Sequence, residues 1–425
     1  MTLKPNVVRK VVLPSGLTLL TEHMKDTFSV SMGIFIKVGS VHETPKNSGI
    51  AHLIEHMLFK GTRTRSARQL AEVMDAIGGR TNAYTSKEHT LLHATVTKDH
   101  TEFALEFLSD VLFNHVMTVK DLELEKNVVL EEIKMVEDAA DEYIHDVAEQ
   151  MMWPQDSLGQ LIIGPRANVA GFKLKDLKAF IRRYYRPENM VIAVAGKIRH
   201  ETIKHWVEKY FKPRSNSRRS TRVIPRPRSK PGFLYIPRRS EQANFSLAYP
   251  MSGYRSDRVA VQQVIHMILG GAMSSRLFQE VREKLGLAYS IGTNASYYRD
   301  AGIFSIFAGT SPDNTEKAVK VILRELRRLS EQKLSPREIA KVKEKIYGAT
   351  YLGYETAEAH MMWLGRCEIQ YDKQLTIDQV IKEIHAVRPI DVRREAQRLF
   401  IDQRPTFAVI GPLKAKHQLK ELVDG

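Results

Sequence analysis

The sequence predicts an α+β protein of two homologous domains, each a largely antiparallel β-sheet packed with helices. Its 425 residues are too many for one hydrophobic core, so two or more domains are expected. Short strands joined by tight turns, such as 11–13 and 17–20 around Pro14-Ser15-Gly16, alternate with clusters of helices, which favours antiparallel sheets. Both halves also repeat one order of early strands, an amphipathic helix, hairpins, further helices and a late strand.

A basic segment rich in proline and serine divides the chain near its middle. Residues 212–231 contain hardly an apolar residue, a composition typical of a solvated linker. We therefore expect one domain at 1–211 and its homologue at 232–425. The alternative, a dedicated nucleic-acid site, is disfavoured because no aromatic residues for stacking interleave the basic ones.

The composition limits the class of protein. The net charge is +15 at pH 7 and the isoelectric point is near 9.6, but charge alone does not specify nucleic-acid binding. The longest apolar runs, such as 191–195, are of strand length, so we expect no membrane span. Pro14 and Gly16 interrupt the apolar run near the N-terminus, which argues against an export signal. The single Cys367 can form no intramolecular disulfide, and we expect a cytoplasmic location.

The stretch His52-Leu53-Ile54-Glu55-His56 carries the clearest chemical signal. In a helix, His52 and His56 stand one turn apart on one face, where two imidazole nitrogens can bind one metal ion. Glu55 lies beside them and could take a proton from metal-bound water, as metal-assisted hydrolysis requires. The alternative is a pair of polar residues on the solvated face of a helix. The intervening glutamate favours a metal site.

The flanking residues predict that this stretch is helical. Asn47-Ser48 offers an N-cap, and Gly61 offers a C-terminal stop. Four apolar residues would cover the buried side of the helix: Leu53, Ile54, Met57 and Leu58.

A catalytic zinc site takes three protein ligands and leaves one position for water, so one more side chain must come from elsewhere. The pattern of residues 122–134 predicts a helix buried on one side. Within it, Glu125 and Glu132 are two helical turns apart, which places both carboxylates on one face. An ordinary solvated acidic face is the alternative.

These features resemble the pitrilysin and insulinase family of zinc metallopeptidases, whose inverted motif is His-x-x-Glu-His. The resemblance is to the short bacterial branch, which is similar to the beta subunit of the mitochondrial processing peptidase. It implies that Glu132, 76 residues after His56, is the third metal ligand and that Glu125 supports the site without binding the metal. Further matching blocks lie in both halves of the chain, at 59–62, 82–86, 125–132 and 270–278.

The resemblance also implies a substrate-binding edge strand that contains Asn82, Ala83, Tyr84 and Thr85. An extended peptide would add itself to this strand through main-chain hydrogen bonds. The alternation of residues through 90–96 predicts a neighbouring strand. The alternative is an ordinary hairpin after Gly78-Gly79.

In the second half, Arg282 and Tyr289 match family residues that contact substrate and stabilise the tetrahedral intermediate. An arginine can donate several hydrogen bonds to a peptide carbonyl, and a tyrosine hydroxyl can donate to a developing oxyanion. Taken alone, the two residues would be a surface charge and a half-buried strand residue.

The second half is expected to lack the metal-binding residues. An ungapped alignment of the two predicted amphipathic helices places Gln262 opposite His52 and Ile265 opposite Glu55. By the same resemblance, the second domain would shape the substrate chamber.

The resemblance implies a zinc-dependent endopeptidase with one Zn²⁺ per chain that hydrolyses unfolded or extended peptides inside a clamshell chamber. One chain supplies one pair of domains, so a homodimer is implied, in which Arg282 and Tyr289 complete the partner's active site. Both histidine ligands must be neutral, so activity is expected to fall below about pH 6.

Two other functions remain as alternatives. A catalytically inactive structural or substrate-binding subunit of a peptidase complex would usually lack part of the metal set, which is complete here in His52, Glu55, His56 and Glu132. The interpretation as an RNA-binding protein is supported only by the net charge, because the sequence has no recognisable nucleic-acid motif.

Overall fold

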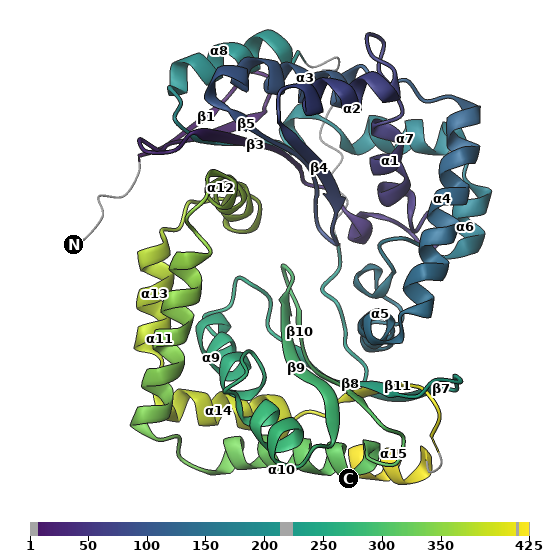
Figure 1. Cartoon of the computed structure of the whole chain (residues 1–425), viewed down its shortest axis with the longest axis vertical. Coiled ribbons are helices and arrows are strands. Elements are labelled where there is room, and N and C mark those ends of the chain that lie inside the picture. The colour runs from purple at the N-terminus through teal and green to yellow at the C-terminus, as the bar shows by residue number, and fades with distance from the viewer. Residues whose placement is uncertain (1–6, 213–223, 414–415, 425) are drawn as a thin grey trace. The chain divides into compact units, whose positions relative to one another are not determined.

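A computed structural model describes residues 7–212, 224–413 and 416–424, and these form two compact units. The first unit combines Met1–Ile133, Gln160–Ile224 and Leu352–Leu375. The second unit combines Lys134–Gly159, Pro225–Tyr351 and Thr376–Gly425. Each unit contains one β-sheet and its covering helices (Figure 1). The predicted α+β class with two domains is therefore confirmed. Most of the expected linker, 213–223, lies outside the described residues.

The first unit contains a six-stranded sheet with the order β1-β2-β6-β3-β5-β4. β2 and β6 are parallel, and every other neighbouring pair is antiparallel. β4 is an edge strand that pairs only with β5. The strands are β1 (Val8–Val12), β2 (Thr18–His23), β3 (Ser29–Ile36), β4 (Arg80–Thr85), β5 (Thr90–Thr97) and β6 (Met190–Gly196).

The described residues of the second unit repeat this topology without a counterpart of β1. Its five-stranded sheet has the order β7-β11-β8-β10-β9, and β7 and β11 form its one parallel pair. Taken in chain order, the five strands match β2 to β6 one by one, which supports the predicted duplication. The strands are β7 (Gly232–Ile236), β8 (Ala243–Met251), β9 (Ala288–Tyr297), β10 (Gly302–Thr310) and β11 (Thr406–Ile410).

In each unit, one glycine lies where the end of the last strand comes very close to the start of another strand. Gly196 is the last residue of β6, and Gly411 directly follows β11. Their φ angles are 141° and 142°, where residues with a side chain are strained. A Cβ on Gly196 would meet the carbonyl oxygen of Ser29 at 2.6 Å, and one on Gly411 would meet Cα of Ala243 at 2.7 Å. Ser29 and Ala243 begin the equivalent strands β3 and β8. Glycine is therefore required at both turns.

The main core of the first unit lies between its sheet and the helices on one face, among them α3 and α8 (Figure 1). These helices are α1 (Ile50–Leu58), α2 (Ala67–Ala76), α3 (Thr101–Phe113), α4 (Val119–Asp138), α6 (Arg166–Gly171), α7 (Leu174–Tyr184) and α8 (His200–Tyr210). The second unit contains α9 (Val259–Leu269), α10 (Thr315–Glu331), α11 (Pro336–Leu352), α13 (Ile377–Ala386), α14 (Pro389–Phe400) and α15 (Lys416–Asp424).

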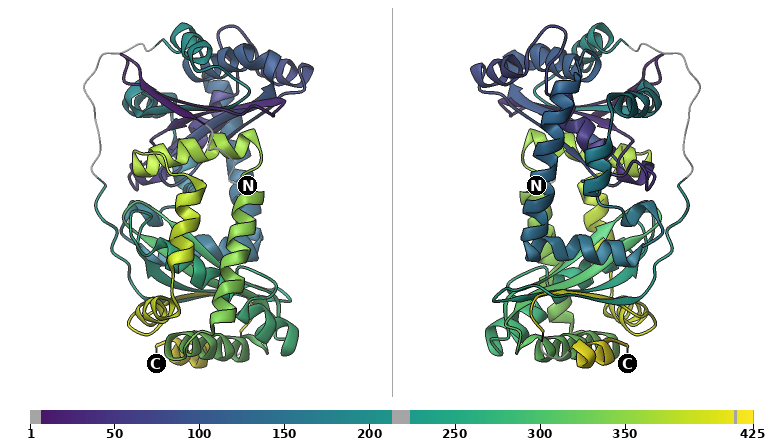
Figure 2. Two further views of the ribbon diagram at one scale, coloured as in Figure 1. Left: turned by 90° about the vertical axis from the view of Figure 1, so that its left-hand side faces the viewer. Right: turned by 90° about the vertical axis from the view of Figure 1, so that its right-hand side faces the viewer.

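Each half of the chain contributes one helix to the other half's sheet. Helix α5 (Ala140–Met152) packs against β8 and β11, and α12 (Ala357–Tyr371) packs against β3 and β6. The yellow-green α12 lies along the strands of the first unit in both side views (Figure 2). The units therefore exchange a helix across the expected boundary, and the assignment of 1–211 and 232–425 as functional domains stays a prediction.

Close backbone approach and a buried polar contact hold α12 on its sheet. A Cβ on Gly33 of β3 would meet Met361 Sδ at 2.5 Å, and a Cβ on Gly365 of α12 would overlap the buried Phe35 ring. At one end of the helix, His360 Nδ1 lies 2.7 Å from Glu22 Oε1. Because both glycines lack a side chain, the helix can lie directly on the sheet.

None of the described helices is long and apolar enough to cross a membrane. Cys367 is buried and free, and burial raises the pKa of its thiol to about 11.

We expect Gly365→Ala to lower the stability of the protein by about 1–3 kcal/mol, because the added methyl overpacks against Phe35. Gly348→Ala in α11 is the matched control, since its Cβ would meet nothing within 4 Å and alanine favours a helix by up to about 1 kcal/mol. Thermal unfolding should give a lower midpoint for Gly365→Ala and an unchanged or higher one for Gly348→Ala. Equal midpoints would contradict the packing of α12.

Candidate metal centre

Helix α1 carries the histidine pair, and its apolar side is fully buried as predicted, through Leu53, Ile54, Met57 and Leu58. The predicted N-cap is wrong. The N-cap is Gly49, which has a φ of 95° and makes no side-chain cap. The Asn47 side chain instead accepts hydrogen bonds from the backbone and hydroxyl of Thr44.

The carboxylate of Glu43 takes the place of a side-chain cap. Its two oxygens accept hydrogen bonds from the backbone N–H groups of Gly49 and Ala51, each at 2.8 Å. Burial raises the pKa of Glu43 to about 8, against the opposing effect of these N–H groups and of Lys87. The role of Glu43 was not predicted, because this residue lies outside the helix and outside the positions at which caps are recognised.

Three ligand groups converge beside α1. His52 Nε2 and His56 Nε2 each lie 3.7 Å from an oxygen of Glu132, which comes from α4. The ligand atoms of the three residues all lie within 4.8 Å of one another. In the part of the chain that the structure describes, this is the one cluster of three or more such residues with metal-binding spacing.

The spacing fits a tetrahedral metal ion. Separations of 3.7 Å are too long for hydrogen bonds between the carboxylate and the imidazoles. Ligand atoms about 2.1 Å from a tetrahedral zinc ion lie about 3.4 Å from one another. Two imidazoles and one carboxylate are a set that binds zinc in hydrolases and leaves a fourth position open. The residues present therefore fit a catalytic zinc ion.

A second acidic residue of α4, Glu125, contacts His56 at Nδ1, the ring nitrogen that does not face Glu132. Glu125 Oε2 lies 3.1 Å from His56 Nδ1, and its other oxygen lies 2.5 Å from Lys60 Nζ. The Glu125 side chain is only 3% exposed, so Lys60 offsets a buried charge. A carboxylate on Nδ1 directs Nε2 toward a metal. No role was predicted for Lys60, because its pairing with Glu125 depends on how the segment after α1 packs against α4. His52 Nδ1 is buried and has no hydrogen-bond partner among the described residues.

Glu55 points toward the edge strand β4. The hydroxyl of Thr85, at the end of β4, donates a 2.6 Å hydrogen bond to Glu55 Oε2. Burial raises the pKa of Glu55; the Thr85 hydrogen bond opposes this rise, and the charge of Glu132 adds to it. A proton-accepting group thus lies beside the metal-ligating cluster.

The other residues expected to bind substrate also lie in β4. Asn82, Ala83 and Tyr84 precede Thr85 in the strand, and the edge position leaves one side of its backbone without a neighbouring strand. The Tyr84 side chain is 37% exposed, which leaves it accessible to a ligand. The neighbouring strand expected at 90–96 is present as β5, which pairs with β4.

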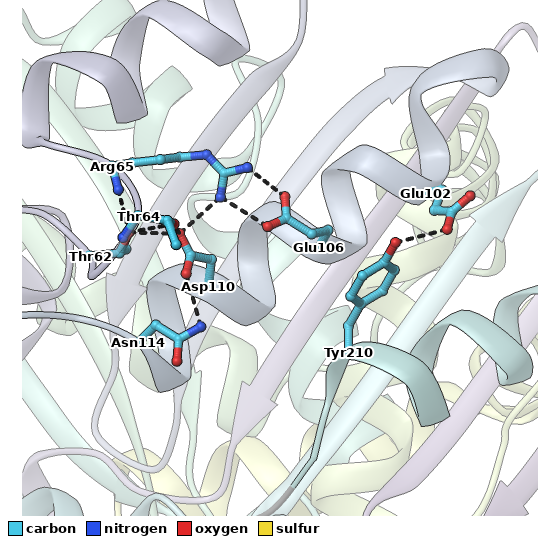
Figure 3. Close-up of polar contacts among 8 residues, drawn as sticks. All are labelled: Thr62, Thr64, Arg65, Glu102, Glu106, Asp110, Asn114 and Tyr210. Atoms are coloured by element: carbon cyan, nitrogen blue, oxygen red, sulfur yellow. Dashed lines mark hydrogen bonds and ion pairs between the residues drawn. The ribbon is translucent and has the colours of Figure 1, made fainter.

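A polar network fixes the loop that follows α1 (Figure 3). The buried carboxylate of Asp110 in α3 accepts hydrogen bonds from Thr62, Thr64, Arg65 and Asn114 at 2.7–2.9 Å. Arg65 also binds both oxygens of Glu106. The loop that follows His56 and Lys60 is therefore tied to α3.

Arg282 and Tyr289 belong to the second unit. Arg282 lies in the π-helical turn η5 (Phe278–Lys284), with its guanidinium 4.9 Å from the centre of the Phe278 ring. The Arg282 side chain is 46% exposed, and Tyr289 on the edge strand β9 is 62% exposed. Their catalytic role stays a prediction.

The equivalent helix of the second unit, α9, carries different chemistry. Gln262 is fully buried and donates a 2.7 Å hydrogen bond to Glu395. His266 Nδ1 contacts the Thr293 hydroxyl at 2.8 Å. These side chains serve packing and hydrogen bonding within the unit.

Fold and site together define an α+β protein with the donor set of a zinc hydrolase. The model of the Insulinase (Peptidase family M16) domain matches residues 18–166, and that of the Peptidase M16 inactive domain matches residues 171–346. The chain belongs to this family of peptidases.

Relatives and solved structures agree with this assignment. A Bacillus subtilis protein described as an uncharacterized zinc protease is 36% identical, over 96% of this chain and 98% of its own length. A Streptomyces coelicolor protein with the same description is 35% identical, over 96% and 90%. The crystal structure of a protease from Helicobacter pylori has the same fold, with a TM-score of 0.90 at 22% identity over 96% of this chain and all of that chain.

In the metal-free protein, we expect the His52 imidazole to titrate near pH 4, because burial, and then the charge of His56, lower its pKa to about 4. The unfolded chain binds this proton near pH 6.5, so stability of the metal-free protein should fall as the pH drops from 6.5 to 4.

NMR of the histidine ring protons measures this titration, with His52→Asn to assign the signal. A midpoint near the ordinary value of about 6.5 would contradict the described burial.

Proposed function

We propose that this chain is a zinc-dependent endopeptidase that hydrolyses unfolded or extended peptides. The observation that carries the proposal is the convergence of His52, His56 and Glu132, with ligand atoms within 4.8 Å of one another and Glu55 on the same helical turn. Membership of the peptidase family and relatives described as zinc proteases support it.

His52, His56 and Glu132 are assigned to metal binding, so we assign proton transfer to Glu55. A zinc ion held by His52, His56 and Glu132 would lower the pKa of a water molecule and polarise the peptide carbonyl. Glu55 accepts the proton from the attacking water and passes it to the leaving amine, as base and then as acid. Its raised pKa favours holding that proton between the two steps. The hydrogen bond from Thr85 orients the Glu55 carboxylate during both proton transfers.

The edge strand β4 supplies a way to align substrate. An extended peptide can pair with its free edge through main-chain hydrogen bonds, which do not depend on side chains. Thr85 ends this strand and contacts Glu55 directly, so a peptide paired with Asn82, Ala83 and Tyr84 would run toward the base. Folded proteins cannot offer a free backbone in this way, which favours unfolded substrates.

We further propose a cytoplasmic homodimer that encloses a substrate chamber. One chain carries one metal cluster among its described residues and one unit without it. In the proposed dimer, Arg282 and Tyr289 of one protomer donate hydrogen bonds to the substrate and the oxyanion at the partner's metal site.

We expect Glu55→Gln to retain one zinc ion per chain and to lower kcat by at least about 10²-fold, because the amide cannot accept the proton. Glu132→Gln should instead lose the metal, since a ligand charge is removed. Zinc content and cleavage of an unstructured peptide mixture measure the two effects. An inactive subunit would show no cleavage in the parent chain, and full activity of Glu55→Gln would exclude the proposed base.

We expect a mixture of Arg282→Ala chains and Glu55→Gln chains to recover part of the parent activity, because a heterodimer would hold one intact site. Each variant alone is the control and should remain nearly inactive. Heterodimers that form but stay inactive would contradict sharing of the site between protomers.

A further inference from the structure

A pocket of about 430 Å³ lies in the second unit, between the start of α11 and the loop before η5. Its lining includes the apolar side chains of Met267 and Val342. Four of its side chains are cationic, Arg276, Arg337, Lys341 and Lys345, against a single carboxylate, Glu338. The pocket shares no residue with the metal-ligating cluster.

Three of the cations form a row on one face of α11. Arg337, Lys341 and Lys345 are spaced by four residues, so each lies one turn from the next. Like charges at this spacing destabilise a helix. All three are exposed, and we find no ion pair or hydrogen bond from them to any described residue. The row is therefore uncompensated within the described chain.

The one acidic residue of the pocket, Glu338, already forms an ion pair within the pocket. Arg276 donates to both oxygens of Glu338, at 2.8 and 3.1 Å. This leaves the Nη1 group of Arg276 buried and without a partner among the described residues. The N-terminal end of the α11 helix dipole adds to the positive field. Ser274 and Ser335 place hydroxyl groups at the same pocket.

We propose that this pocket binds a small free anion with two or three linked phosphate groups. The row from Arg337 to Lys345 spans about 12 Å along the helix, which a single phosphate cannot bridge. The four cations and the one carboxylate of the pocket leave three positive charges (4 − 1 = 3). A diphosphate or triphosphate carries enough negative charge to offset them, and it reaches further along the row than a single phosphate does. This site is independent of the proposed peptidase activity.

Isothermal titration calorimetry of the full-length chain with inorganic tripolyphosphate tests the proposal at low ionic strength. The protein is first freed of metal, because tripolyphosphate chelates zinc. We expect saturable binding with one site per chain, at least tenfold tighter than for orthophosphate, and weaker binding as sodium chloride is added. Absence of saturable binding would overturn the proposal, as would equal affinity for orthophosphate.

Matched charge variants separate the pocket from general surface charge. Lys341→Gln with Lys345→Gln should weaken tripolyphosphate binding at least tenfold and leaves the Arg276–Glu338 pair intact. The control, Lys317→Gln with Arg327→Gln, removes two exposed cations of α10 in the same unit and should change affinity less than twofold. Equal weakening in both, or binding of the parent to anionic phospholipid vesicles without binding of tripolyphosphate, would overturn the proposal.

Discussion

The placement of helix α1 is the constraint on which the candidate site depends. Its first turn is held by the buried carboxylate of Glu43, its apolar side by the core, and the loop after it by Asp110. With both ends of the helix fixed, the Nε2 atoms of His52 and His56 each lie 3.7 Å from an oxygen of Glu132 in α4. Small movements of α1 would separate the three ligands, so the rigidity of the surroundings is part of the site.

The site concentrates groups whose charged forms are disfavoured by burial. The pKa of His52 is lowered, and those of Glu55 and Glu43 are raised, mainly by desolvation. Such perturbed groups gather at functional sites. A neutral His52 is ready to bind a metal ion without first losing a proton. Glu125 is also buried, but Lys60 offsets its charge, so α4 supplies one neutralised carboxylate and one, Glu132, that is directed at the cluster.

The duplicated topology separates what the fold needs from what the chemistry needs. Both sheets share their strand order and a glycine at the end of the last strand. The glycine recurs because the backbone approaches a neighbouring strand closely at both places. The helices α1 and α9 occupy equivalent places, yet Gln262 in α9 bonds to Glu395. One fold therefore carries a metal cluster in one unit and a hydrogen-bonded core helix in the other. The exchanged helices α5 and α12 were not predicted, because strand and helix patterns do not specify which sheet a helix covers.

By itself, the sequence determined the α+β class, some of the strands, the helical histidine pair and the two carboxylates on one face of α4, because these follow from local periodicity and spacing. The positions of β4 at a sheet edge and of Glu132 near the histidines followed only from the family resemblance. Tertiary structure alone decided that Glu43 caps α1, that Lys60 neutralises Glu125, that Thr85 holds Glu55 and that α12 crosses to the first sheet. These contacts join residues distant in the chain, and their energies arise from packing and desolvation that no local pattern records.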